Sequence, residues 1–148
     1  MEKEKEGILK MKSIQAEVAQ TIRKELKEKF PGIKFSVRSD SFAGGNSIDI
    51  DYTNGVPADD IRKMVNKYES GHFDGMTDMY NYYGNRDYPT AKFISVDRKI
   101  TDDVREKTKI DIAKRYGIKD INDDQEWFNK FQAWSNTVVY RELVDKTL

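Results

Sequence analysis

Near the start of the chain, apolar residues recur every three to four positions. They are Met11, Ile14, Val18, Ile22, Leu26 and Phe30. This spacing lays them on one stripe and predicts a helix from about Gly7 to Lys29. Pro31 ends it, because proline disfavours helical geometry in the residue before it. An apolar stripe needs a partner surface, so we expect the helix to pack on a sheet or on a second helix of the same chain. The polar residues 1–6 are expected to form a disordered tail.

Two segments with a period of two follow. Ile33, Phe35 and Val37 alternate with polar residues, and "SIDIDYT" at 47–53 alternates in the same way. Both patterns predict strands with one buried face. The stretch between them, "SDSFAGGN" at 39–46, is rich in turn-forming residues and predicts an antiparallel hairpin.

Several polar residues of this hairpin are candidates for binding. Arg38, Ser39 and Asp40 are expected at its tip, where a partner could reach them. Asp49 and Asp51 alternate with buried positions, so we expect them to face solvent together.

The next helix is the clearest in the sequence. Pro57 suits a first helical turn, acidic residues follow it, and the later apolar positions share one face. Those positions are Ile61, Met64, Val65 and Tyr68. Beyond them, "DMYNYY" at 78–83 and "AKFISVDR" at 91–98 predict a second strand pair joined by "GNRDYPT".

The last third of the chain is predicted to be helical. One helix runs from Thr101 to a stop at Gly117, with two aspartates in its first turn. A final helix begins near Asp123 and buries Trp127, Phe131, Trp134 and Val138. The whole predicts a single α+β domain over residues 1–148, with a mainly antiparallel sheet built from two strand pairs and about four helices. Its core would be residues 29–97, and residues 101–148 its helical C-terminal part.

The charge of the chain limits the classes of partner that it is expected to bind. The 148 residues carry 26 basic and 26 acidic side chains, which favours neither a duplex-binding protein nor an acidic DNA mimic. Residues 39–88 are acidic, with four Lys/Arg against nine Asp/Glu. The chain has no cysteine, which excludes disulfides and cysteine-ligated metal centres. No apolar run approaches the length of a membrane span. We expect a cytoplasmic protein of a bacterial host that does not contact membrane.

The segment "GHFDGMTDMYNYYGN" at 71–85 holds the only histidine. His72, Asp74 and Asp78 are a weak candidate for a metal-dependent enzyme, because such centres need several convergent ligands on a rigid frame. A structural loop is the favoured interpretation, with Phe73 and Met76 as anchors under the sheet edge. Gly75 would supply an unusual backbone angle, and the two aspartates would bond nearby amides. We therefore predict no metal, no cofactor and no catalytic residue.

Single-stranded nucleic acid is the main alternative ligand. A sheet that displays Tyr80, Tyr82, Tyr83 and Phe93 could stack on unpaired bases. Five of the eight tyrosines lie between residues 68 and 88. The surrounding excess of acidic residues argues against this ligand, because neutralising phosphate is the main source of such affinity.

Several motifs resemble those of the large polyvalent protein-associated domains found in phages and conjugative mobile elements. They are "KFSVRSDS", the glycine pair before "SIDIDYTNG", and "FDGMTD". The resemblance covers residues 29–83 and reaches towards Phe93, so the first helix and the tryptophan-containing last helix are expected to flank the shared segment. It implies a part of a larger protein that acts beside invading DNA, with a role in protecting that DNA or countering host defence. It brings no catalytic residue with it.

We therefore predict a non-enzymatic protein-interaction module of a mobile genetic element, with an anti-defence or antirestriction role implied by the resemblance. The partner would be a host or element-encoded protein, and nucleic acid a less favoured ligand. The contact residues expected are Arg38, Ser39, Asp40, Asp49, Asp51, His72, Asp74, Asp78 and Tyr80. The sequence gives no indication of oligomeric state.

Overall fold

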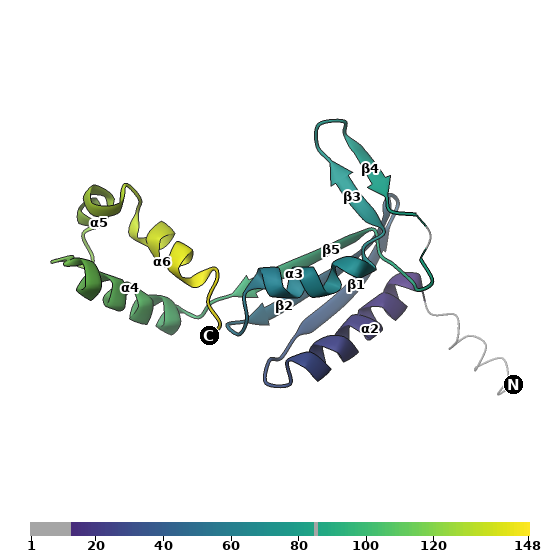
Figure 1. The fold of residues 1–148 in the computed structure, drawn as a ribbon, viewed down its shortest axis with the longest axis horizontal. Coiled ribbons are helices and arrows are strands. Elements are labelled where there is room, and N and C mark those ends of the chain that lie inside the picture. Colours follow the sequence, from purple (N-terminus) through teal and green to yellow (C-terminus); the bar gives the residue numbers. More distant parts are fainter. Residues whose placement is uncertain (1–12, 85) are drawn as a thin grey trace, which may run out of the picture. The chain divides into compact units, whose positions relative to one another are not determined.

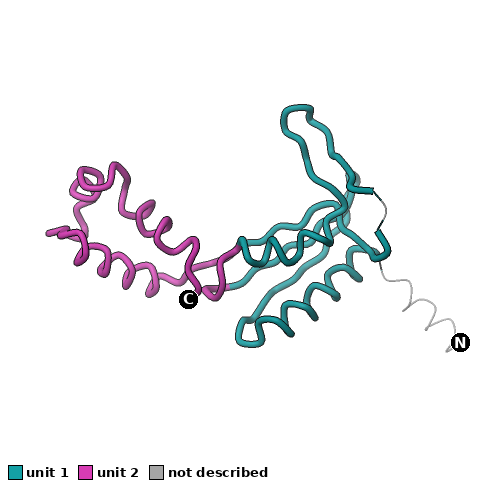
Figure 2. The backbone as a smooth tube through the Cα atoms, viewed as in Figure 1, with its two compact units in different colours: residues 1–52, 59–97 teal, residues 53–58, 98–148 magenta. Residues whose placement is uncertain are grey.

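A computed structural model describes residues 13–84 and 86–148 (Figure 1). The expected tail at 1–6 and the first turns of the expected helix lie outside the described residues. The chain divides into two compact units, residues 1–52 with 59–97 and residues 53–58 with 98–148 (Figure 2). They are called unit 1 and unit 2, and each is described by itself. The described part contains five α-helices and two sheets, which confirms the α+β class.

Unit 1 begins with α2 (Ile14–Lys29), which Ser13 caps by accepting a hydrogen bond from the Ala16 amide. The predicted stripe is confirmed along most of the helix, because Val18, Ala19, Ile22 and Leu26 are buried. Ile14, the first residue of the stripe within the described part of the chain, is not part of the core, since it is 58% exposed. Met11 lies outside the described residues.

The first predicted hairpin is confirmed as β1 (Ser36–Phe42) and β2 (Gly45–Thr53), paired antiparallel. The turn is only Ala43 and Gly44, so the strands extend through residues that composition had assigned to a loop. Gly45 has φ +149, and a Cβ there would lie 2.6 Å from the Lys92 Cδ, so the tight reversal depends on glycine. The expectation that residues 38–40 form the hairpin tip was therefore wrong.

Two helical pieces follow, α3 (Ala58–Val65) and the short 3₁₀ turn η1 (Asn66–Tyr68). Their expected apolar face is confirmed, because Ile61, Val65 and Tyr68 are buried. Helices α2 and α3 cover the face of the sheet that carries the buried side chains of β1 and β2 (Figure 1). Those side chains are Val37, Ile48, Ile50 and Tyr52.

The third strand of this sheet is β5 (Phe93–Lys99), in the order β1-β2-β5. Lys92 bonds to Asn46, and Ser95 bonds to Asp49 three residues further along both segments. The contacts advance in the same direction, so β5 runs parallel to β2. A parallel neighbour requires a long crossover connection, which α3 and the segment after it provide.

The remaining strands, β3 (Gly71–Asp74) and β4 (Met79–Tyr82), form a separate antiparallel hairpin. The predicted pairing of 78–83 with 91–98 was therefore wrong, although both strands exist. Closing a four-residue loop costs little chain entropy. Asp74 supports this loop by accepting a hydrogen bond of 3.0 Å from the Met76 amide.

Unit 2 is built from α4 (Asp102–Tyr116), α5 (Asp124–Phe131) and α6 (Ser135–Leu143). The predicted stop of α4 is confirmed, because Gly117 has the left-handed φ of 72° that ends many helices. The shared core consists of Ile112, Ala113, Trp127, Val139 and Leu143.

The sequence predicted a single final helix, and this prediction was wrong. Gln132 adopts a left-handed backbone with φ 57° and ends α5, and α6 starts again three residues later. Trp134 lies at that break and is 51% exposed, where its ring packs 4.7 Å from the centroid of Phe128.

One arginine joins three segments of unit 2. The Arg98 guanidinium donates hydrogen bonds to the carbonyl oxygens of Asn54 and Gly55, at 3.0 and 2.8 Å. It also donates to the carbonyls of Leu143 and Lys146, at 3.0 and 2.6 Å. Hydrogen bonds from a charged donor are stronger than neutral ones. This cluster therefore fixes the end of α6 to the turn at 54–55.

Candidate interaction surface

Eight of the nine residues that the sequence selected fall in two places within unit 1. Four of them lie on the face of the three-stranded sheet that α2 and α3 leave uncovered. These are Arg38, Asp40, Asp49 and Asp51. Ser39 shares the register position of Ile48 and so belongs to the opposite face. The other four belong to the β3–β4 hairpin or its loop.

The uncovered sheet face is polar and internally paired. Arg38 forms an ion pair of 2.7 Å with Asp51, and Asp49 accepts a 2.6 Å hydrogen bond from Ser95. The expectation that Asp49 and Asp51 point away from the core together is confirmed. Partly exposed pairs of this kind contribute little to stability, so the pairing is not a major support of the sheet.

The β3–β4 hairpin departs from the expected structural loop. Phe73 is 55% exposed and Met76 98% exposed, so neither anchors the sheet edge and that prediction was wrong. Gly75 has no left-handed angle; Asp78, with φ 55°, supplies it instead. The expected role of Asp74 as a turn acid is confirmed. A hydrogen bond from the Met76 amide, followed by one from the Thr77 side chain, lowers the pKa of its carboxyl.

Exposed rings on this hairpin continue onto the sheet. Tyr80 packs against Tyr82, with ring centroids 4.8 Å apart, and against Phe93 at 5.5 Å. Phe93 stacks in turn on Phe42 at 6.2 Å, and Phe73 stands opposite Tyr80 across the hairpin. We call these five residues the aromatic strip. It joins the tip of the β1–β2 hairpin to the middle and base of the β3–β4 hairpin.

Tyr80 is the least exposed ring and the anchor of the strip. Its hydroxyl donates to the Lys92 carbonyl at 2.5 Å. Burial, with a smaller contribution from the charge of Glu69, raises the pKa of Tyr80 to about 12, so the hydroxyl stays protonated near neutral pH. Gly71 makes room for it, because a Cβ there would meet the Asn81 carbonyl at 2.1 Å and the Tyr80 ring at 2.8 Å.

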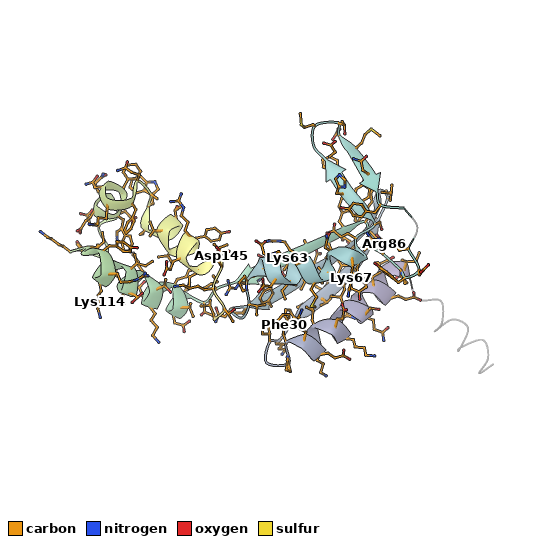
Figure 3. The ribbon with its side chains drawn as sticks, in the orientation of Figure 1. Phe30, Lys63, Lys67, Arg86, Lys114 and Asp145 are labelled. Atoms are coloured by element: carbon orange, nitrogen blue, oxygen red, sulfur yellow. The ribbon has the colours of Figure 1, made fainter. Side chains whose placement is uncertain are left out.

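Cationic side chains border the rings. The Lys92 Nζ lies 5.0 Å from the Tyr80 ring centroid and donates to the Gly44 carbonyl. On the neighbouring segment, Arg86 lies 5.5 Å from the Tyr83 ring and donates to the Lys67 carbonyl at 3.0 Å (Figure 3). Both cations are thus occupied in holding local structure.

His72 lies beside an aromatic ring. Its ring centroid is 5.5 Å from that of Tyr83. Within residues 13–84 and 86–148, no group of three or more histidine and carboxylate side chains is placed to hold a metal ion. The structure therefore does not bring His72, Asp74 and Asp78 together as a ligand set.

Sequence reasoning found part of the strip. It named Tyr80, Tyr82 and Phe93 as rings that could face a ligand, and it missed Phe42 and assigned Phe73 to the core. A signal for Phe42 was its place beside two small residues and two glycines, where a tight turn leaves little to cover a ring.

The exposure of each side chain in this hairpin determines how much its substitution should lower the free energy of unfolding. Phe73→Ala and His72→Ala should each lower the free energy of unfolding by less than about 1 kcal/mol, because both side chains are exposed. Urea denaturation followed by circular dichroism measures this. A loss for Phe73→Ala of about 3 kcal/mol, the range of a buried phenylalanine, would contradict the exposed placement.

The profile of one protein family, described as large polyvalent protein associated domain 29, matches residues 14–127. The chain belongs to this family. The match starts at α2 and ends in α5. The expectation that the first helix flanks the family segment was wrong, whereas the predicted last helix lies beyond it except for its first turn. No curated protein and no solved structure matched the chain. No helix in the described part of the chain is long and apolar enough to cross a membrane.

Proposed function

We propose that this domain is a non-enzymatic protein-interaction module of a phage or conjugative element, and that the aromatic strip is its contact surface. The single observation that carries the proposal is the exposure of connected rings. Phe42 is 46% exposed and Tyr82 66% exposed, although both lie beside other strip residues. Exposed apolar patches of this kind mark interaction sites, and tyrosine and phenylalanine are enriched in protein interfaces.

Charge supports a protein partner over single-stranded nucleic acid. Residues 71–84 contain two aspartates and no lysine or arginine. The uncovered sheet face next to the strip adds four aspartates, Asp40, Asp49, Asp51 and Asp97, against two basic residues, Arg38 and Lys99. Stacking of bases on such rings would bring phosphates towards these carboxylates, and binding to nucleic acid depends mainly on phosphate neutralisation.

The polar groups of the strip support a binding role without catalysis. The Tyr80 hydroxyl is committed to the Lys92 carbonyl, and its raised pKa makes it a poor base near neutral pH. Family membership supports a role beside the DNA of a mobile element. An anti-defence or antirestriction activity in the bacterial cytoplasm, directed at a host or element-encoded protein, completes the proposal.

Affinity capture from a bacterial host tests this. The tagged domain is compared with a Phe73→Ser, Tyr82→Ser double variant, and captured proteins are quantified by mass spectrometry. We expect the double variant to lose at least about tenfold of a specific partner, because exposed aromatic anchors dominate many interfaces.

Tyr140→Ser is the matched control, because Tyr140 is 62% exposed and lies on α6 of unit 2. It should retain the partner. Equal capture by the wild type and the double variant would overturn the proposal, and so would binding of an oligothymidine at physiological salt that the double variant abolishes.

A further inference from the structure

The hydrogen-bond pattern of the β3–β4 hairpin fixes which backbone groups face outward. The Tyr83 amide donates to the Ser70 carbonyl at 2.9 Å. Antiparallel pairs alternate between bonded and non-bonded, so with the observed register His72 and Asn81 form the next bonded pair. The Phe73–Tyr80 and Gly71–Tyr82 pairs are then non-bonded. Their N–H and C=O groups point away from the partner strand.

At the base of the hairpin, the edge along β4 is the accessible one. Gly71, on the β3 side, is buried, whereas Tyr82 is 66% exposed. By this alternation, the backbone amides and carbonyls of Tyr80 and Tyr82 point outward along this edge. A two-stranded hairpin is only marginally stable alone, and a third strand on this edge would stabilise it.

At the edges of the three-stranded sheet, in contrast, backbone groups are hydrogen-bonded to side chains. On β1, the outward carbonyl of Val37 accepts a 2.5 Å hydrogen bond from Arg23 of α2. The Ser41 amide on the same strand bonds to the side chain of Asp40 at 2.9 Å. On β5, the Val96 carbonyl accepts from Arg62 of α3.

Proteins commonly protect edge strands in such ways against pairing with other chains. The β4 sequence, "MYNY", has neither the lysine nor the proline that usually performs this task. The contrast marks β4 as the edge that is left open.

We propose that β4 accepts an extended strand from a partner protein, in which apolar residues alternate with lysine or arginine. The inference rests on the proposed function and specifies how the partner binds. Successive side chains of a strand point to opposite faces. The apolar ones would extend the aromatic strip beside Tyr80 and Tyr82, and the basic ones would lie on the face that carries His72 and Asp74.

The acidic charge of the β3–β4 hairpin favours a partner strand that carries basic residues. Between residues 71 and 84 the only Asp, Glu, Lys or Arg side chains are Asp74 and Asp78, both acidic. The bordering cations, Lys92 and Arg86, each already donate to a backbone carbonyl. An added strand with acidic residues would meet like charge, and one without apolar residues would leave the strip uncovered. Strand addition of this type combines backbone hydrogen bonds with side-chain selection.

The test uses defined peptides. The probe is a blocked octapeptide in which valine and lysine alternate, titrated into the full chain while backbone amide NMR shifts are recorded. Control peptides alternate valine with glutamate and glycine with lysine. We expect the valine–lysine peptide to bind, with shifts concentrated at β4, and both controls to bind at least about tenfold more weakly.

Two substitutions separate backbone pairing from ring contact. Tyr82→Ala and Tyr82→Pro both remove the ring, but only proline removes the outward N–H, and proline is tolerated at strand edges. We expect the proline variant to bind the valine–lysine peptide at least about fivefold more weakly than the alanine variant, because it lacks the edge amide.

A second measurement does not depend on how the proline variant folds. Two versions of the peptide, N-methylated either at every valine or at every lysine, are titrated into the wild-type chain. Strand addition requires one set of peptide amides, so one version should lose binding while the other keeps it. Equal binding of both versions, or failure of the unmodified peptide to bind, overturns the inference.

Different results would overturn the protein-interaction function and the addition of a strand to β4. If capture of the cellular partner is lost in the Phe73→Ser, Tyr82→Ser variant but is equal for Tyr82→Ala and Tyr82→Pro, the protein-interaction function stands and strand addition is overturned.

Discussion

Replacing Trp127 with alanine should lower the free energy of unfolding of unit 2 by about 3 to 5 kcal/mol, the range for removing a large buried ring. Trp127 is fully buried, stacks on Phe131 at 5.7 Å and donates from its indole nitrogen to the Ile121 carbonyl at 3.0 Å. The substitution therefore opens a cavity and also removes a donor from a carbonyl. Urea denaturation followed by far-ultraviolet circular dichroism measures the loss.

Trp134→Ala is the matched control, because it removes the same side chain from an exposed site. We expect it to cost less than about 1 kcal/mol. Equal losses for the two tryptophans would mean that the last helix is continuous and buries both rings, as the periodicity alone had predicted.

Replacing Ile22 with alanine should lower the free energy of unfolding of unit 1 by about 2 to 4 kcal/mol, because the side chain is removed from a closely packed site. Ile22 is fully buried in the stripe of α2. Ile14→Ala, on the same helix, should cost less than about 0.5 kcal/mol, because its side chain is mainly in water.

The same denaturation measurement compares the two variants. A result near zero for both would show that α2 is not packed on the sheet. A large loss for Ile14→Ala would place the start of the helix inside the core.

The elements of this fold were largely predictable because their signals are local. Alternation placed Ile48 and Ile50 on one face of a strand, and Gly117 marked the end of α4. Strand pairing was not predictable in the same way. Periodicity shows which face of a strand is buried, but it does not show which strand lies beside it, so β5 was assigned to β4 and not to β2.

The errors at the candidate site have a related cause. Phe73 and Met76 were assigned to the core because they are apolar, yet a residue type does not report whether another element covers it. Gln132 is a similar case in unit 2. Its left-handed backbone breaks the last helix, and glutamine is not a residue that composition associates with that geometry.

The hydrogen bonds of Arg98 join residues whose codons should be inherited together. The positions it joins are far apart in the gene, since its guanidinium reaches the carbonyls of Asn54 and Gly55 as well as the end of α6. Asn54 and Gly55 both have positive φ, 55° and 68°, a geometry that asparagine and glycine tolerate best. A recombination event between codons 55 and 98 would separate the arginine from the turn to which it is fitted. We expect these three positions to covary among relatives, so that chains lacking the arginine also lack the Asn–Gly pair.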